Sequence, residues 1–274
     1  MERIQKAIEK ARDARQAQGE QAKTPGEKAE RAHGTGRALI PTTWADLTKF
    51  TPNLKHFHDM RIVTPESDQQ AASFDVIRTR LRQQMQANGW RRVAITSPSA
   101  ACGKTTASVN LAFSMARQAK LKAMLIELDL RHPSMAKILG LQNQHQFSKV
   151  LSASAAFSEH AVVYDDNLAI ATNHSPIERP AELLSGSDSA RIIDGIEKLY
   201  KPDIMIFDMP PMLGNDDVMA FLDQIDCVLL IAAAEKTTYE EIEKCEATIA
   251  SRSNFLGVVL NKCRYLDKAE REGS

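Results

Sequence analysis

The sequence of 274 residues lacks several features that mark whole classes of protein. No apolar run approaches the roughly 20 residues of a membrane-spanning helix, and the N-terminus has no apolar signal-peptide core. The four cysteines, Cys102, Cys227, Cys245 and Cys263, include no C-x-x-C pair, which argues against a disulfide framework or a zinc site. Lys plus Arg equal Asp plus Glu, 35 each, so net charge favours no nucleic-acid partner. We expect the protein to be cytoplasmic and to associate with a membrane only through a partner.

Composition divides the chain into four segments. Residues 1–18 place small and branched apolar residues at helical spacing, which predicts an amphipathic helix, either a docking face or a weakly structured tail. Residues 19–63 begin as a polar linker and then regain apolar residues that we expect to pack on the main domain as irregular structure. Residues 64–263 form the main domain, and 264–274 a short polar tail.

Within the main domain, apolar runs of strand length alternate with helical segments. Strands are predicted at 93–96, 123–128, 168–171, 204–207, 227–232 and 256–260. Helices are predicted at 67–88, 105–118, 181–200, 215–223 and 239–252. Strands without polar alternation, separated by helices, predict an α/β fold with a mostly parallel sheet covered on both faces. In such sheets the ligand lies beyond the carboxyl ends of the strands.

The first of these strand ends has the layout of a phosphate-binding loop. Strand 93–96 leads through a turn of small residues into Gly103, Lys104, Thr105 and a helix. Loop N–H groups and the helix N-terminus together form an anion site, Lys104 can reach the β- and γ-phosphates, and the Thr105 hydroxyl can bind Mg²⁺. The usual first glycine is replaced by Pro98, and taken alone the stretch also suits an ordinary strand-to-helix turn.

Two later strand ends carry acidic residues. Glu127 and Asp129 follow one apolar run, with Arg131 two residues further on, and period-2 spacing points both carboxylates to one side. Asp208 follows another run, before Pro210-Pro211, where an aspartate can hold Mg²⁺ through water. Each acid alone also fits a helix cap or a solvated loop. In this order behind the Gly-Lys-Thr loop, they predict a nucleotide and Mg²⁺ site.

The order of motifs resembles a known family. SP-x4-GKTT, MLIELDLRHPS, RPAELLSG, IMIFDMPPML and GVVLNK are similar to the bacterial tyrosine kinases of capsule and exopolysaccharide synthesis, the BY-kinases. These belong to the deviant Walker A group of P-loop ATPases. The resemblance covers residues 64–263, and ERIQKAIEKA near the N-terminus resembles the exosortase-associated branch. It implies a P-loop NTPase fold, ATP and Mg²⁺ as cofactors, self-association, and a membrane-embedded polysaccharide chain-length regulator as partner.

The resemblance also implies roles for individual residues. ATP contacts fall on the Walker A loop and one downstream asparagine: Ala101, Cys102, Gly103, Lys104, Thr105, Thr106 and Asn261. The resemblance implies that Thr105, Glu127, Asp129 and Asp208 bind Mg²⁺. It implies catalytic roles for Lys104, Asp129 and Arg131. Asn261 would read the adenine edge, although an asparagine at a strand end is also common in turns.

The chain departs from this family at four places. Ala100-Ala101 replaces the usual Pro-Gly, and Glu127 replaces an aspartate. The Glu-x-x-Arg-x-x-Arg register of the family's oligomerisation helix reads Ala72-x-x-Asp75-x-x-Arg78. The tail holds one tyrosine, Tyr265, where autokinases carry a run of acceptor tyrosines.

Three functions follow from these observations. The leading hypothesis is an ATP- and Mg²⁺-dependent protein tyrosine kinase of exopolysaccharide synthesis or export. A regulatory ATPase of the same system, without kinase activity, is the alternative that the departures favour. A partition-type ATPase is disfavoured by the neutral charge and by Pro180-Ala181-Glu182-Leu183-Leu184-Ser185. Cys102 is either a redox-sensitive thiol beside Lys104 or a small residue that fits the loop.

Overall fold

The computed structural model describes residues 43–65, 71–142 and 144–263. The predicted N-terminal helix, most of the predicted linker, Ser67 and the tail with Tyr265 lie outside the described residues. None of the helices in the described ranges is both long and apolar enough to cross a lipid bilayer.

The described chain alternates strands and helices as the apolar runs predicted. The strands are β1 (Thr48–Lys49), β2 (Arg92–Thr96), β3 (Ala123–Glu127), β4 (Ala161–Tyr164), β5 (Leu168–Ala171), β6 (Ile204–Asp208), β7 (Cys227–Ala233) and β8 (Asn254–Asn261). The α-helices are α2 (Leu54–Asp59), α3 (Ala72–Asn88), α4 (Lys104–Ala116), α5 (Met135–Leu139), α6 (Phe147–Leu151), α7 (Pro180–Ser185), α8 (Ser187–Tyr200), α9 (Asp217–Phe221) and α10 (Tyr239–Ala250). Short 3-10 turns lie at Trp44–Asp46, Phe157–Glu159 and Leu222–Gln224.

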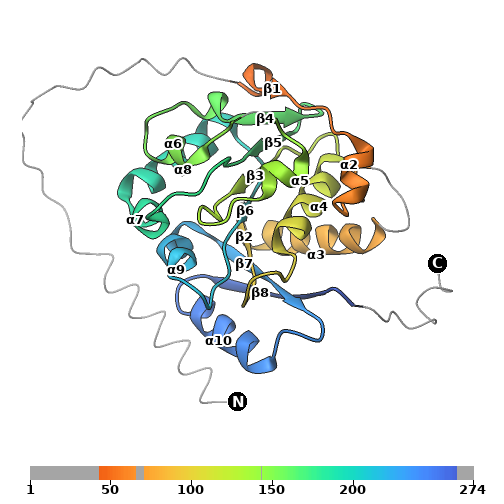
Figure 1. Ribbon diagram of the computed structural model, residues 1–274, viewed down its shortest axis with the longest axis vertical. Helices are drawn as coiled ribbons and strands as arrows, with labels where there is room; N and C mark the ends of the chain where they lie inside the picture. Colours follow the sequence, from red (N-terminus) through yellow and green to blue (C-terminus); the bar gives the residue numbers. More distant parts are fainter. Residues whose placement is uncertain (1–42, 66–70, 143, 264–274) are drawn as a thin grey trace, which may run out of the picture. The chain divides into compact units, whose positions relative to one another are not determined.

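The strands form one sheet in the order β1-β4-β5-β3-β6-β2-β7-β8 (Figure 1). All pairs between these strands are parallel except β4 with β5, which are antiparallel neighbours along the chain. β3, β6, β2 and β7 lie side by side, so their carboxyl ends share one edge of the sheet. The α/β fold with a mostly parallel sheet is confirmed.

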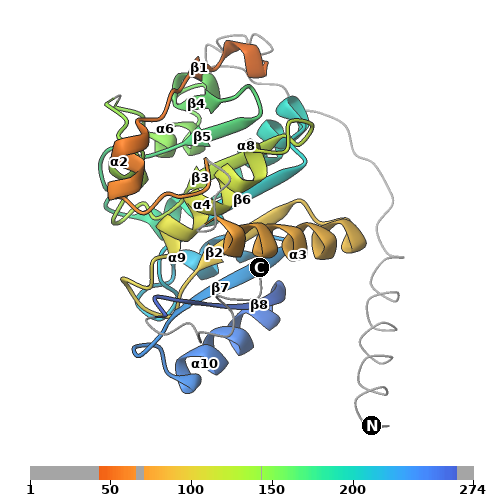
Figure 2. The ribbon, with the colours of Figure 1, turned by 90° about the vertical axis from the view of Figure 1, so that its right-hand side faces the viewer.

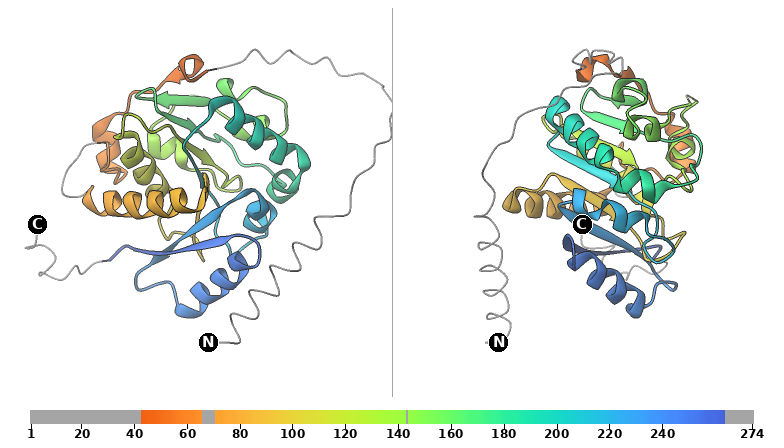
Figure 3. Two further views of the ribbon diagram at one scale, coloured as in Figure 1. Left: turned by 180° about the vertical axis from the view of Figure 1, so that it is seen from behind. Right: turned by 90° about the vertical axis from the view of Figure 1, so that its left-hand side faces the viewer.

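The sheet is buried because helices cover both of its faces. The central strands β3, β6 and β7 are buried throughout, which explains why their sequences are continuous apolar runs rather than alternating ones. One apolar cluster joins one face to α6–α10, and the other joins the opposite face to α2–α5. Figures 1 and 3 show α3 and α8 on opposite sides of the strands, and Figure 2 looks onto the side that α3 and α4 cover.

Three local features differ from expectation. Residues 45–63, expected to be irregular, form β1 and α2, and β1 pairs with β4, a strand that was not predicted. The predicted helix 181–200 is two helices, because Gly186 adopts an extended conformation (φ −64°, ψ 141°) between α7 and α8. The predicted helix 215–223 is shorter, since α9 ends at Phe221 in a 3-10 turn.

Candidate nucleotide site

The predicted phosphate-binding loop lies between β2 and α4. Residues 97–103 connect β2 to Lys104, the first residue of α4. Gly103 has a φ of +88°, and a Cβ atom there would lie 2.4 Å from the side-chain nitrogen of Asn261, so glycine is the residue that fits. The first N–H groups of a helix have no acceptor within the helix, which suits the start of α4 to an anion. The backbone therefore has the form that a phosphate site requires.

Lys104 and Asp129 meet beside this loop. The Lys104 Nζ donates to Oδ2 of Asp129 at 2.6 Å, and the two side chains are only 12% and 5% exposed. Burial lowers the pKa of Lys104, but the carboxylates of Asp208 and Asp129 outweigh it, and the net effect is a raised pKa. A charged ammonium group is thus held at the entrance of α4.

Asp208 ends β6 and is fully buried. Its Oδ1 accepts the Ser108 hydroxyl at 3.0 Å, whereas its Oδ2 has no hydrogen-bond partner among the described residues. Burial raises its pKa, and the charge of Lys104 and the hydroxyl of Thr105 counteract this only in part. A buried carboxylate oxygen without a partner is unfavourable unless something binds it. Asp208 therefore fits a cation or a cation-bound water.

The carboxylates do not form a metal centre by themselves. Across the described residues, no three His, Cys, Asp or Glu side chains gather closely enough to hold a metal ion. Mg²⁺ in nucleotide sites is commonly held by one or two carboxylates together with phosphates and water. The site thus suits a cation that arrives with a nucleotide.

Glu127 is fully buried at the end of β3, and backbone amides occupy both of its oxygens. Oε1 accepts the N–H groups of Ser134 (2.7 Å) and Met135 (2.8 Å), and Oε2 accepts that of Asn173 (2.8 Å). Burial raises its pKa to about 7 against the lowering effect of these donors. Although Glu127 and Asp129 were expected to face one site, they bind different partners, because the chain leaves the strand at Glu127. Glu127 ties together the loops that follow β3 and β5.

Arg131 lies in a bidentate ion pair with Asp217, the first residue of α9. Its Nε and one terminal nitrogen donate to the two Asp217 oxygens at 2.6 and 2.9 Å. The Asp217 side chain is fully buried, and that of Arg131 is 36% exposed. Hydrogen bonding to Asp217 raises the pKa of Arg131. The pair holds the loop after β3 against the segment after β6.

The other predicted nucleotide contacts lie in or against the loop. Asn261 donates from its Nδ2 to the Cys102 carbonyl oxygen at 2.9 Å. Thr105 and Thr106 lie in the first turn of α4, and Ala101 adopts a left-handed φ of +62°. The structure thus brings Asn261, at the end of β8, to the phosphate-binding loop.

Cys102 is buried beneath this loop. Its Sγ lies 3.7 Å from the hydroxyl oxygens of Ser99 and Thr237. Burial raises the pKa of the thiol, but these hydroxyls and the charge of Lys236 outweigh that effect and lower it overall. Full burial is consistent with a small residue that fills the loop.

Three residues of the site were missed by sequence reasoning. Asp217 lies within the predicted helix 215–223 and was assigned no role, although it holds Arg131. Lys236 and Thr237 lie in the β7–α10 connection, and the Lys236 Nζ donates to the Ala100 carbonyl oxygen at 2.5 Å. No motif includes these residues, so only the order of neighbouring strands could have indicated that they lie near the phosphate-binding loop.

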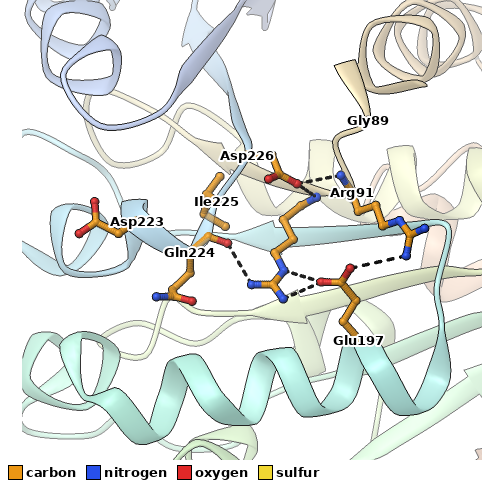
Figure 4. A pocket seen from close by; sticks show the side chains of 8 residues that line it. Gly89, Arg91, Glu197, Asp223, Gln224, Ile225 and Asp226 are labelled. Carbon is orange, nitrogen blue, oxygen red and sulfur yellow. Dashed lines mark hydrogen bonds and ion pairs between the residues drawn. The ribbon is translucent and has the colours of Figure 1, made fainter. Parts of the chain in front are cut away.

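A concavity of about 440 Å³ lies at the amino-terminal edge of the strands, opposite the phosphate-binding loop (Figure 4). There Arg92 bonds to Glu197 at 2.7 Å and to Asp194 at 2.6 Å, and Asp226 accepts the backbone N–H groups of Arg91 and Arg92. The charged groups of this concavity largely satisfy one another, so it has the character of a structural ion-pair network.

Comparison with known proteins agrees with this geometry. The family model described as "AAA domain" matches residues 91–254. "Tyrosine-protein kinase YwqD" of Bacillus subtilis is 30% identical over 173 residues, which cover 62% of this chain and 72% of that protein.

Two solved structures are similar in fold. "The chimerical protein CapA2B2" has a TM-score of 0.67 at 23% identity, covering 82% of this chain and 95% of that one. "The kinase domain of Escherichia coli tyrosine kinase ETK" has a TM-score of 0.65 at 23% identity, covering 73% and 79%. The family match, the curated relative and the shared fold lead to one conclusion: the chain belongs to the AAA domain family and, within it, to the bacterial tyrosine-protein kinases.

Proposed function

We propose that the chain is a protein tyrosine kinase that uses ATP and Mg²⁺. The observation that carries this proposal is the meeting of Lys104, Asp129 and the unpartnered Oδ2 of Asp208 at the start of α4. Membership of the tyrosine-protein kinases supports the reaction class, since relatives are named for it.

The loop and α4 would hold the phosphates of ATP. Backbone N–H groups from Ala101 to Thr106 supply neutral donors, and the Lys104 ammonium supplies the charge. Asn261 bonds to the Cys102 carbonyl oxygen, which places its carboxamide beside the loop, where it could contact the base.

Thr105, Asp129 and Asp208 are the residues that would hold Mg²⁺. Bound there, the ion would neutralise charge on the β- and γ-phosphates during transfer. Glu127, the fourth predicted ligand, already accepts three backbone N–H groups, so its contribution is to hold the surrounding loops in place.

Asp129 is the candidate group to orient and deprotonate the tyrosine hydroxyl. Its Oδ2 is paired with Lys104, and its Oδ1 accepts the backbone N–H of His132 at 3.1 Å, which fixes the carboxylate. When Lys104 turns to a phosphate, Oδ2 is released for a hydroxyl donor. Arg131, held by Asp217, adds a positive charge at the rim of the site.

The proposed setting is the synthesis or export of exopolysaccharide on the cytoplasmic side of the inner membrane. A membrane-embedded chain-length regulator is the proposed partner. The resemblance of the sequence motifs supports this setting.

The test is phosphotyrosine formation by the purified full chain with ATP and Mg²⁺. A synthetic copolymer of glutamate and tyrosine serves as acceptor, and Lys104→Met is compared with Lys137→Met, which removes an exposed lysine of α5. We expect wild type and Lys137→Met to phosphorylate the copolymer and Lys104→Met to fail. ATP binding and hydrolysis without phosphotyrosine on any acceptor would overturn the kinase and favour a nucleotide-driven regulatory switch.

A further inference from the structure

The three tyrosines that the structure describes differ in their accessibility. Tyr200 is 4% exposed, and its ring packs edge-on against Trp44 and Phe157. Tyr164 is half-buried, with its ring centroid 4.9 Å from that of Phe113. Tyr239 is 88% exposed. A tyrosine can accept phosphate only if its side chain can enter a kinase active site. Of the three described tyrosines, only Tyr239 is exposed enough for this.

The backbone at Tyr239 is fixed without the help of its side chain. Tyr239 is the first residue of α10, behind the N-cap Thr238. Thr238 Oγ1 accepts the Glu241 N–H at 3.2 Å, and the Glu241 carboxylate accepts the Thr238 N–H at 2.9 Å, which completes a capping box. The phenol ring is therefore presented from a rigid helix start.

Charges of both signs surround this position. The positive end of the helix dipole and a nearby lysine attract a phosphate dianion, whereas the carboxylates of Glu240 and Glu241 in the first turn repel it. Lys236, three residues before, supplies a cation on the same connection, and its Nζ contacts the phosphate-binding loop at Ala100. Tyr239 thus belongs to the segment that borders the nucleotide site.

The order of the strands separates the ends of β3 and β7, the strands that precede Asp129 and Tyr239. Asp129 follows β3 and Tyr239 follows β7, and two strands, β6 and β2, lie between them (Figure 1). Neighbouring strands are about 4.8 Å apart, so β3 and β7 are about 14 Å apart at the edge where both end. The attacking oxygen has to come within about 3.5 Å of the phosphorus. Between two copies of the chain no such separation has to be crossed.

We propose that Tyr239 is a phosphate acceptor of this protein and that a second copy of the chain phosphorylates it. The phenol oxygen forms a bond to the γ-phosphorus of ATP while the bond from that phosphorus to the β–γ bridging oxygen breaks. ADP leaves with the bridging oxygen, and the phenol proton passes to Asp129 of the copy that holds ATP. This inference rests on the proposed kinase function.

The experiment mixes two full-length variants with ATP and Mg²⁺. Lys104→Met is the acceptor without kinase activity, and Tyr239→Phe is the kinase without this acceptor. Trypsin cleaves after Lys236 and Lys244, so the peptide 237–244 carries Tyr239, while Tyr265 lies in another peptide. In the mixture, a phosphorylated peptide 237–244 that contains tyrosine can come only from the Lys104→Met chain. Fragmentation assigns the phosphate to tyrosine rather than threonine.

We expect phosphate on Tyr239 in wild type and in the mixture, and none on this peptide with Lys104→Met alone. Tyr239→Phe should lose most of the incorporated phosphotyrosine, Tyr265→Phe should retain it, and both should phosphorylate the copolymer like wild type. Copolymer phosphorylation with Tyr239 unmodified would overturn this inference but leave the kinase intact. If wild type does not phosphorylate the copolymer, both the proposed kinase function and the inference about Tyr239 are overturned.

Discussion

Replacing Gly103 with alanine tests the geometry of the phosphate-binding loop. A non-glycine residue at the left-handed φ of Gly103 costs about 1–2 kcal/mol. The added Cβ would also lie 2.4 Å from Nδ2 of Asn261, so Asn261 must turn away and lose its 2.9 Å hydrogen bond to Cys102. Because a lost hydrogen bond costs about 1 kcal/mol, we expect the free energy of unfolding to fall by about 2–3 kcal/mol.

A double-mutant cycle separates the two contributions. Asn261→Ala alone loses the same hydrogen bond, about 1 kcal/mol. In the double variant the bond is lost once and the backbone strain remains, so its loss should be smaller than the sum of the single losses by about 1 kcal/mol. Urea unfolding of the four proteins, without nucleotide, measures this difference.

Gly89 provides the matched control. It has a φ of +69°, but a Cβ there would meet no atom within 4 Å, so Gly89→Ala reports backbone strain alone. We expect Gly89→Ala to destabilise less than Gly103→Ala and to leave ATP binding unchanged, whereas Gly103→Ala weakens it. Additive effects of Gly103→Ala and Asn261→Ala, or equal effects of the two glycine variants, would refute the contact between loop and Asn261.

Three further results are expected from urea unfolding. Ala101→Gly should raise the free energy of unfolding by about 1 kcal/mol, because Ala101 has a left-handed φ of +62°; a decrease would contradict this. Arg131→Ala should lower it by about 1–3 kcal/mol by leaving the buried Asp217 carboxylate unpaired, and an unchanged midpoint would show that the pair contributes nothing. Glu127 has a folded pKa of about 7 against an ordinary value of 4.5, so the folded state binds more protons in this window and its stability falls as the pH rises from 4.5 towards 7. Glu127→Gln should remove up to about 3 kcal/mol of this pH dependence when Mg²⁺ and nucleotide are absent, and an identical pH profile in the variant would contradict the raised pKa.

The central strands could be predicted closely because burial on both faces leaves a simple signal. β2, β3 and β6 are uninterrupted apolar runs, and each observed strand begins and ends within one residue of its prediction. β1 has two exposed residues and no such signal, whereas β4 is a largely buried apolar run of four that was missed. β1 lies at the edge of the sheet and pairs with β4, and β4 pairs with β5; local sequence does not encode this pairing.

The sequence was sufficient to predict which loops come together to form the site. The shared edge of parallel strands brings Lys104, Asp129 and Asp208 together, as strand order and motifs indicate. The contacts of Glu127 were not predictable, because its donors are backbone amides: two at the start of α5, positions 134 and 135, and one at position 173, 46 residues away in sequence. A carboxylate in a metal-binding motif and one that organises backbone look alike in sequence.

At the start of α3, Asp75 departs from the family pattern and has partners within its own chain. Where the resemblance implies an arginine for self-association, Asp75 instead points inward, and its Oδ1 accepts from Arg78, Ser114 and Arg117. Arg78 also donates to the Ser114 carbonyl oxygen at 3.0 Å, so α3 is bound to α4, the helix that begins at Lys104. These charged groups pair within one chain, although the buried Nε atoms of Arg78 and Arg117 have no hydrogen-bond partner among the described residues. Phosphate transfer to Tyr239 would therefore depend on a transient encounter between copies through another surface, and its rate should rise with protein concentration.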